Sequence, residues 1–152
     1  MKVEFLHGTE TGTAEIVCED LEEAVSDRVD SKVTSLEDMD VGSFDADTFY
    51  VVVCSTFGSG DLPSTAEPFF DALKASKPDL SHVRFAMFGL GDKTFGETFN
   101  QGSEKLLEAM VECNAKLVGE RGLADAASAD MPEEIAVPWL EGILEQVSEP
   151  QG

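Results

Sequence analysis

The sequence predicts a doubly wound α/β fold, in which a parallel sheet carries helices on both faces. Five strand-like segments alternate with helical patterns along the 152 residues. One of them, TFYVVVC at residues 48–54, is an unbroken run of β-branched and aromatic residues, typical of a strand that is buried on both faces. Parallel neighbours need long right-handed crossovers, and the helical patterns between the strands can supply them.

Strands and helices are placed along the chain by the spacing of the apolar residues. Besides residues 48–54, strands are predicted at residues 3–6, 32–35, 83–88 and 115–118. Helices are predicted where apolar side chains recur every three or four positions, near residues 17–25, 66–73, 106–111 and 135–147. The last helix has a well-marked start, with Asp130 as N-cap, Pro132 in the first turn and Glu133 at the capping-box position. The acidic, small residues at 120–130 predict a loop.

The length and the charge exclude several classes of protein. A chain of 152 residues fits one core of ordinary size, so residues 1–152 are expected to form a single domain and, by default, a monomer. Ten Lys and Arg residues against 31 Asp and Glu residues give a net charge of −21, which repels nucleic acids and anionic lipids. No apolar run approaches the roughly 18 residues of a membrane span, and the first residues show no signal-peptide pattern. A cytoplasmic protein that binds neither nucleic acid nor membranes is expected.

The cysteine and histidine residues show no pattern of catalysis or metal binding. Cys18, Cys54 and Cys113 are odd in number and include no CxxC pair, so neither a metal site nor a disulfide framework is predicted. They are expected to be small buried hydrophobic residues in a reducing compartment. His7 and His82 have no Ser or Cys partner that suggests a triad, so each is expected to be structural or exposed. No catalytic residue is predicted.

The loop after the first strand is rich in threonine and glycine and leads directly into a helix. It reads HGTETGTA from His7 to Ala14. The unpaired N–H groups and the dipole of a helix start favour an anion, and threonine hydroxyls can complete its shell without any cation. A Walker loop would need a lysine here, and the dinucleotide fingerprint GxGxxG is missing after this strand. The loop indicates a phosphate site, with an ordinary threonine-rich helix cap as the alternative.

Two further loops place an aromatic residue beside a glycine near a strand end. Phe57 precedes Gly58 after the third strand, and Phe95 lies in the loop GDKTFGETFN after the fourth strand. Each phenylalanine alone could anchor its loop in the core. Loops after neighbouring parallel strands meet at one edge of the sheet, where two rings can enclose a flat ligand. Together the three loops predict a phosphorylated planar cofactor.

The three segments together are characteristic of one family. GTETGTAE, STFGSGD and FGLGDKTFGETFN, in this order and spacing, resemble the flavodoxins, and especially the FMN domains of diflavin reductases such as the sulfite reductase flavoprotein. The resemblance covers nearly the whole chain, since GERGLAD and Trp139 are also similar to the end of those domains. It implies FMN as the cofactor and a sheet of strand order 2-1-3-4-5. A short-chain form is implied, because the insertion that marks long-chain flavodoxins is missing after Val118.

By matching positions, the resemblance implies which residues contact FMN. The phosphate would be held by Thr9, Glu10, Thr11, Gly12, Thr13 and Ala14. The isoalloxazine ring would be lined by Ser55, Thr56, Phe57 and Gly58. The other side of the ring would be formed by Leu90, Gly91, Asp92, Phe95 and Asn100, with Phe99 as the alternative stacking residue. Asp125 matches a loop aspartate near the flavin.

The chain departs from its relatives at the ring loops. Phe57 and Phe95 stand where the relatives commonly carry tyrosine, which keeps the stacking face and removes two hydroxyls. One extra residue near Gly96 leaves open whether Phe95 or Phe99 stacks on the ring. An altered affinity for FMN is therefore expected.

The resemblance implies an electron carrier rather than an enzyme. FMN supplies the redox chemistry, and the protein holds it and tunes its electronics. Asp61, Asp92 and Asp125 would put negative charge around the flavin, which opposes an anionic reduced flavin and predicts a low potential. The implied function is a one-electron carrier. Its donor would be a flavodoxin reductase or a ferredoxin-type enzyme, and its acceptor a redox enzyme.

Two other functions remain as alternatives, and the negative charge of the chain has two possible explanations. The main one is an FMN-dependent NAD(P)H oxidoreductase on the same fold, although no basic cluster suits a 2′-phosphate. A phosphorylation receiver would need an aspartate at the end of the third strand, where Val53, Cys54, Ser55 and Thr56 stand. The negative charge either steers basic partners or suits a salty cytoplasm, and melting curves at low and molar salt separate these.

Overall fold

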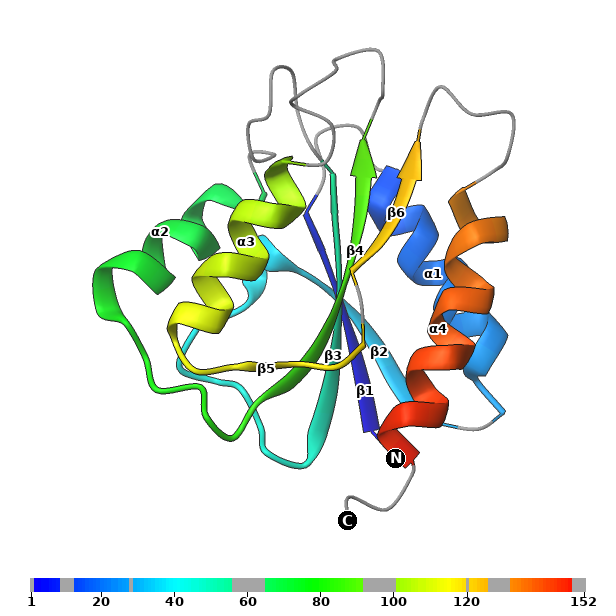
Figure 1. Cartoon of the computed structure of the whole chain (residues 1–152), viewed down its shortest axis with the longest axis horizontal. Coiled ribbons are helices and arrows are strands. Elements are labelled where there is room, and N and C mark those ends of the chain that lie inside the picture. The colour runs from blue at the N-terminus through cyan, green and yellow to red at the C-terminus, as the bar shows by residue number, and fades with distance from the viewer. Residues whose placement is uncertain are drawn as a thin grey trace.

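The computed structural model shows a parallel sheet with helices on both of its faces (Figure 1). It describes residues 2–8, 13–27, 29–55, 65–91, 101–119, 121–125 and 132–148. The strands of this part are β1 (Lys2–Gly8), β2 (Asp30–Ser35), β3 (Thr48–Ser55), β4 (Arg84–Gly91), β5 (Lys116–Leu117) and β6 (Gly122–Asp125). The helices are α1 (Thr13–Val25), α2 (Glu67–Ser76), α3 (Gln101–Glu112) and α4 (Pro132–Ser148), and the 3-10 helix η1 (Leu36–Asp38) follows β2.

The order of the strands confirms the doubly wound fold. It is β2-β1-β3-β4-β5, with β6 also paired to β4, and all of these pairings are parallel. β1, β3 and β4 lie inside the sheet. Residues 49–54 of β3 are at most 1% exposed, as the run of β-branched and aromatic residues predicts for a strand covered on both faces.

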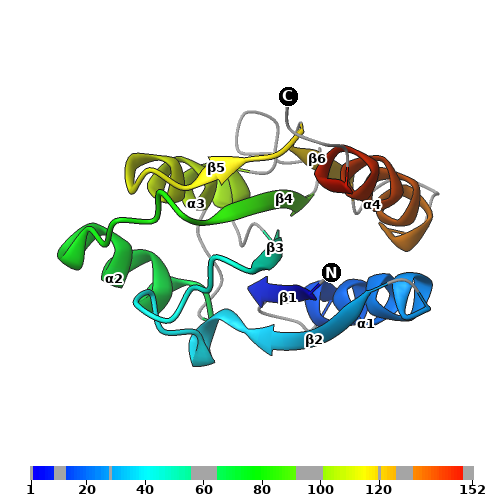
Figure 2. The same ribbon diagram turned by 90° about the horizontal axis from the view of Figure 1, so that it is seen from below.

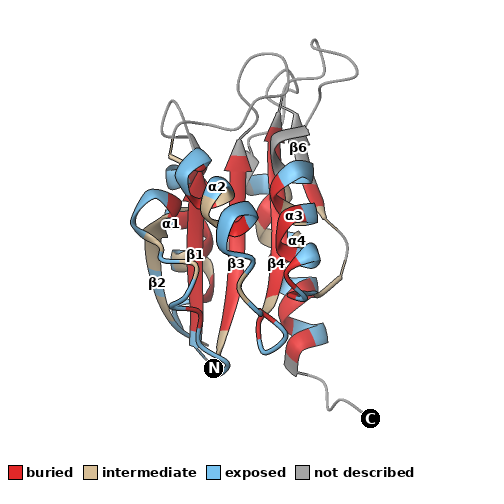
Figure 3. Cartoon of the chain, turned by 90° about the vertical axis from the view of Figure 1, so that its left-hand side faces the viewer, coloured by how far each residue is buried: buried red, intermediate tan, exposed pale blue. Residues whose placement is uncertain are grey.

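A hydrophobic core lies on each face of the sheet. Figure 2 shows α1 and α4 on one side and α2 and α3 on the other. Because side chains alternate along a strand, Val3 and Phe5 of β1 pack toward α1 and α4, and Leu6 packs toward α2 and α3. In Figure 3 the buried central strands stand between helices whose outer faces are exposed. The alternation of strands and amphipathic helices in the sequence is thus realised as three layers.

The fifth position of the sheet differs from the prediction. The sequence predicts one strand at residues 115–118 and a loop at 120–130, but residues 122–125 form a second strand. β5 pairs with the start of β4, and β6 pairs with its end. The two pieces are separated at Gly119, whose φ of +70° is left-handed and favours glycine. The sequence GLAD lacks β-branched and aromatic residues, so pairing with β4 imposes its strand conformation.

The connection from β2 to β3 carries no α-helix. Residues 29–55 are all described, and between the two strands only η1 forms a helical turn. Leu36 and Phe44 anchor this connection, and the Phe44 ring packs edge-on against Tyr50 with the ring centroids 4.7 Å apart. The amino-terminal half of β1 and β2 is left without a covering helix on this face.

The predictions for the cysteines, for His82 and for the closing helix agree with the structure of the described residues. Cys18, Cys54 and Cys113 are buried, and none of them forms a disulfide. His82 is exposed, and its Nε2 lies 3.1 Å from the carbonyl oxygen of Phe44. The closing helix begins at Pro132, while its predicted cap Asp130 lies outside the described residues. Within those residues, no helix has the length and apolar character needed to cross a membrane.

Candidate functional site

Three neighbouring strands of the sheet end side by side. Gly8 of β1 lies opposite Cys54 of β3, and Ser55 at the end of β3 lies opposite Leu90 of β4. The carboxyl ends of these strands form the edge of the sheet at the top of Figure 1. Open α/β sheets bind ligands outside this edge, at the point where the strand order reverses. In this chain the order reverses between β1 and β3.

Part of the predicted ligand-binding set lies within the described residues. These are Thr13 and Ala14 at the start of α1, Ser55 at the end of β3, Leu90 and Gly91 at the end of β4, and Asp125 at the end of β6. The structure brings them to the same edge, and Gly91 and Asp125 are register partners. The other members lie outside the described residues: Thr9, Glu10, Thr11, Gly12, Thr56, Phe57, Gly58, Asp92, Phe95, Phe99 and Asn100.

Two of the predicted residues have their side chains in the core. Ala14 is fully buried and Leu90 is 6% exposed, and both belong to the core cluster on the side of α1 and α4. Their side chains therefore stabilise the elements that end at the edge. Only their main-chain groups are candidates for contact with a ligand.

Gly8 closes β1 at a place where no side chain fits. A Cβ atom on Gly8 would lie 2.8 Å from the Cβ of Ala66 and 3.0 Å from Cδ1 of Leu36. Ala66 precedes α2 and Leu36 begins η1, so the end of β1 is held tightly between two other elements. The close approach fixes the point from which the chain turns toward α1.

His7 is buried at this edge, which the sequence did not indicate. Its side chain is 7% exposed, and its register partners are Ser35 of β2 and Val53 of β3. No hydrogen-bond partner for its Nδ1 exists in the described structure. Burial lowers the pKa of His7 below its usual 6.5, and the negative charges of Glu15, Glu19 and Asp38 oppose this shift. The imidazole is therefore neutral at pH 7.

The charge on α1 is entirely negative. Its sequence TAEIVCEDLEEAV contains five carboxylates and no lysine or arginine. Glu15 lies in the first turn, where the helix dipole favours a negative charge. The amino end of α1 thus offers an anion N–H groups and the dipole, but the helix supplies no cationic side chain.

The cysteine at this edge is not a reactive thiol. Cys54 is fully buried, and burial raises the pKa of its thiol to about 12. It is protonated at neutral pH, and the thiolate is the reactive form of cysteine. Redox chemistry at this edge therefore does not come from Cys54.

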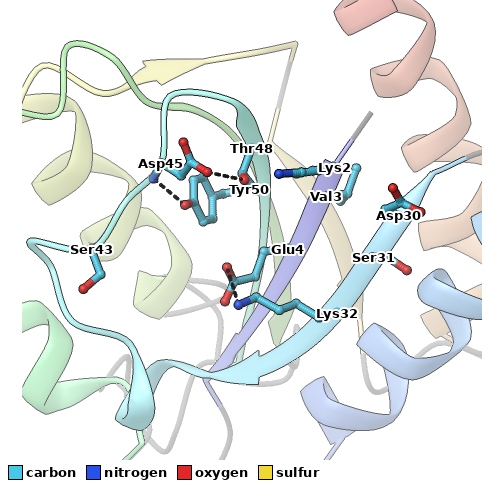
Figure 4. A pocket seen from close by; sticks show the side chains of 10 residues that line it. All are labelled: Lys2, Val3, Glu4, Asp30, Ser31, Lys32, Ser43, Asp45, Thr48 and Tyr50. Atoms are coloured by element: carbon cyan, nitrogen blue, oxygen red, sulfur yellow. Dashed lines mark hydrogen bonds and ion pairs between the residues drawn. The ribbon is translucent and has the colours of Figure 1, made fainter.

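A polar hollow of about 410 Å³ lies at the other end of the sheet (Figure 4). It occupies the area that the helix-free connection between β2 and β3 leaves open. Lys32 Nζ lies 3.6 Å from Oε1 of Glu4, and the main-chain N–H of Asp45 donates to the Tyr50 hydroxyl at 2.6 Å. These two pairs lie at the amino ends of the strands, away from the edge where such sheets bind ligands.

Comparison with known proteins decides the family. The family model for flavodoxin matches residues 6–139. The chain belongs to the flavodoxin family. It is 34% identical over 142 residues to protein MioC of Escherichia coli, covering 91% of this chain and 92% of MioC. It superimposes on a cysteine-to-alanine variant of flavodoxin from Pseudomonas aeruginosa with a TM-score of 0.84 and 29% identity, covering 97% of this chain and all of that one.

The resemblance of this flavodoxin to diflavin reductases is also confirmed. It is 33% identical over 142 residues to NADPH-dependent diflavin oxidoreductase 1 of Emericella nidulans, covering 90% of this chain and 21% of that protein. The match is thus to one part of a longer enzyme. As a member of the flavodoxin family, the chain binds FMN and carries electrons.

The sheet edge formed by the carboxyl ends of β1, β3 and β4 suits FMN. The tight packing around Gly8 brings the end of β1 close to its neighbours, and the start of α1 can receive a phosphate. The ends of β3 and β4 lie in register beside it, so a ring bound there would lie next to the phosphate site. FMN bound there supplies the redox chemistry, and the chain binds it and sets its electrostatic surroundings.

Proposed function

We propose that this flavodoxin is a low-potential one-electron carrier that catalyses no reaction by itself. It would take electrons from a flavodoxin reductase or a ferredoxin-type donor and pass them to a redox enzyme. The observation that carries this proposal is the convergence of β1, β3 and β4, each of which leads into one of the three loops that resemble those of flavodoxins. Residues 1–152 would act as one FMN-binding domain, as a monomer in the cytoplasm.

The three loops divide the binding of FMN between them. Residues 9–14 would hold the phosphate with main-chain N–H groups and threonine hydroxyls. Residues 55–58 and 90–100 would enclose the ring, with Phe57 on one side and Phe95 or Phe99 on the other. The register of Ser55 with Leu90 and of Gly91 with Asp125 supports this division, because it sets the starts of these segments side by side.

The described groups at the edge support a carrier rather than an enzyme. Burial lowers the pKa of His7, its Nδ1 has no hydrogen-bond partner among the described residues, and the Cys54 thiol is protonated. The tasks left to the chain are to bind FMN, to orient it, to exclude water from it and to surround it with negative charge.

The net charge of −21 keeps the potential of the bound flavin low in this proposal. The second electron adds negative charge to the flavin, which the carboxylates oppose. Salt screens this repulsion, because the Debye length falls from about 30 Å at about 0.01 M to about 3 Å at about 1 M. We therefore expect the midpoint potential of the second electron to rise on the order of tens of millivolts over this range. Spectroelectrochemistry with free FMN as the control measures this rise, and an unchanged difference between bound and free FMN contradicts the prediction.

The absence of catalysis by the chain alone is tested with NADPH. We expect the FMN-loaded protein to oxidise NADPH only after a flavodoxin reductase is added, because the sequence shows no basic cluster for the 2′-phosphate of NADPH. The decrease in absorbance of NADPH, followed anaerobically with and without the reductase, measures this. Direct oxidation without the reductase would support the alternative, an FMN-dependent NAD(P)H oxidoreductase.

A further inference from the structure

His7 combines burial, a free ring nitrogen and a place beside the predicted phosphate site. Side chains alternate along β1, so the imidazole lies on the same face of the sheet as Val3 and Phe5, the face that α1 and α4 cover. The side chain is 7% exposed, and within the described residues its Nδ1 has no hydrogen-bond partner. A buried polar nitrogen without a partner costs free energy and points to a partner that arrives later.

Among the described residues, the charged groups that act on His7 are three carboxylates. Glu15 and Glu19 belong to α1, and Asp38 belongs to η1. These three charges favour the imidazolium, whereas burial favours the neutral ring, and burial has the larger effect. Further negative charge nearby acts in the same direction as the three carboxylates. The protonation state of His7 is therefore sensitive to the arrival of an anion.

The first loop and α1 carry no permanent positive charge. Residues 8–25, which span the first loop and α1, contain no lysine, arginine or histidine. Glu15 adds a negative charge to the first turn of α1, where N–H groups and the dipole would receive the phosphate. Of the residues that lead into this loop, His7 alone can acquire a positive charge, since residues 3–6 are Val, Glu, Phe and Leu.

We propose that His7 takes up a proton from solution when the phosphate of FMN binds at the amino end of α1, so that a buried imidazolium supplies the positive charge this anion site otherwise lacks. This inference rests on the proposed function, because the phosphate is that of FMN. No covalent bond changes. Proton uptake on binding means that acidification strengthens the binding of FMN through His7. The titration of the phosphate itself acts in the opposite direction, because its dianion prevails above a pH of about 6.

Nuclear magnetic resonance of the histidine rings tests the inference on the unaltered protein. The sequence contains two histidines, and exposed His82 precedes β4, at the opposite end of the strand from the edge, so it serves as an internal control. The Cε1–H signals are followed against pH without ligand, with FMN, and with riboflavin, which lacks the phosphate. We expect FMN to raise the titration midpoint of His7 by about one unit, a tenfold change in its proton affinity. The His82 signals should not respond to either flavin, and riboflavin should leave the His7 midpoint unchanged.

Binding measurements on variants give an independent readout. His7→Asn keeps a polar side chain that cannot become charged, and His82→Asn is the matched control. We expect the Kd for FMN of His7→Asn to exceed that of the wild type by up to about tenfold at pH 5.5 and to approach it at pH 8.5. His82→Asn should follow the wild type throughout, and riboflavin should bind to all three proteins with the same pH dependence.

The outcomes separate this inference from the proposed function. If FMN binds and the His7 midpoint does not move, or moves equally with riboflavin, the inference is overturned and the carrier function stands. If neither flavin binds, the proposed function itself fails, and the inference with it. Should His7→Asn fail to fold, the titration of the wild-type protein decides the question alone.

Discussion

Gly8→Ala is expected to lower the free energy of unfolding by about 1–3 kcal/mol, the usual cost of overpacking a filled site. The new methyl group would lie 2.8 Å from the Cβ of Ala66 and 3.0 Å from Cδ1 of Leu36. The Leu36 side chain can rotate away, but the Cβ of Ala66 is fixed to the main chain, so β1 or the start of α2 must move. Because β1 leads into the predicted phosphate loop, we also expect FMN to bind about tenfold more weakly or worse, which is about 1.4 kcal/mol.

Gly142→Ala is the matched control for this substitution. Gly142 lies inside α4, and a Cβ atom there would meet nothing within 4 Å. Replacing a helical glycine by alanine stabilises a helix by roughly 0.5–1 kcal/mol, and the affinity for FMN should not change. Urea unfolding followed by circular dichroism and quenching of flavin fluorescence on binding measure the two effects. If Gly8→Ala is as stable as the wild type and binds FMN equally well, tight packing at Gly8 does not position the end of β1.

Phe88→Ala is expected to lower the free energy of unfolding by about 3–5 kcal/mol, the largest loss that we predict. The Phe88 ring is fully buried in β4 and lies with its centroid 5.2 Å from that of Trp139 on α4. It also fills the space above Gly122, where an added Cβ would lie 2.5 Å from Cδ2 of the ring. Removing the ring leaves a cavity between β4, β6 and α4. Because β6 ends at Asp125, we also expect the sheet edge at the carboxyl ends of the strands to become less rigid.

Phe70→Ala provides the comparison for Phe88→Ala. Phe70 lies on α2 and is only partly buried, with Nζ of Lys74 5.6 Å from the centre of its ring. We expect it to cost about 1 kcal/mol, since an exposed cation–π contact and little buried area are lost. Both variants are compared by urea unfolding. Equal losses from the two substitutions would show that Phe88 does not have the structural role assigned to it.

The sequence was sufficient to predict the sheet because its central strands are strongly marked. After Thr48, residues 49–54 contain no charged side chain that would need to face solvent. The structure buries all of them, on both faces of the sheet. β6 could not be predicted, because the sequence GLAD has no β-branched or aromatic residue and so little intrinsic strand propensity. It becomes a strand by pairing with residues more than 30 positions earlier in the chain. Local patterns contain no information about such long-range pairing.

The candidate site was predictable as a set of loops but not as a set of side chains. β1, β3 and β4 are parallel neighbours in the sheet, so the loops that follow them start at the same edge. The burial of Leu90 could not be read from the sequence, since it depends on which face of the sheet the residue occupies at the end of its strand. An alternation count along residues 3–7 would have placed His7 on the covered face with Val3 and Phe5.

Stepwise anaerobic reduction of the protein reconstituted with FMN, followed by its visible spectrum, tests the central claim most directly. We expect one bound FMN for each chain, reduced in two separate one-electron steps, with the second step at a lower potential than in free FMN. Failure to bind FMN, or reduction of bound FMN in a single two-electron step at the potential of the free cofactor, would contradict it.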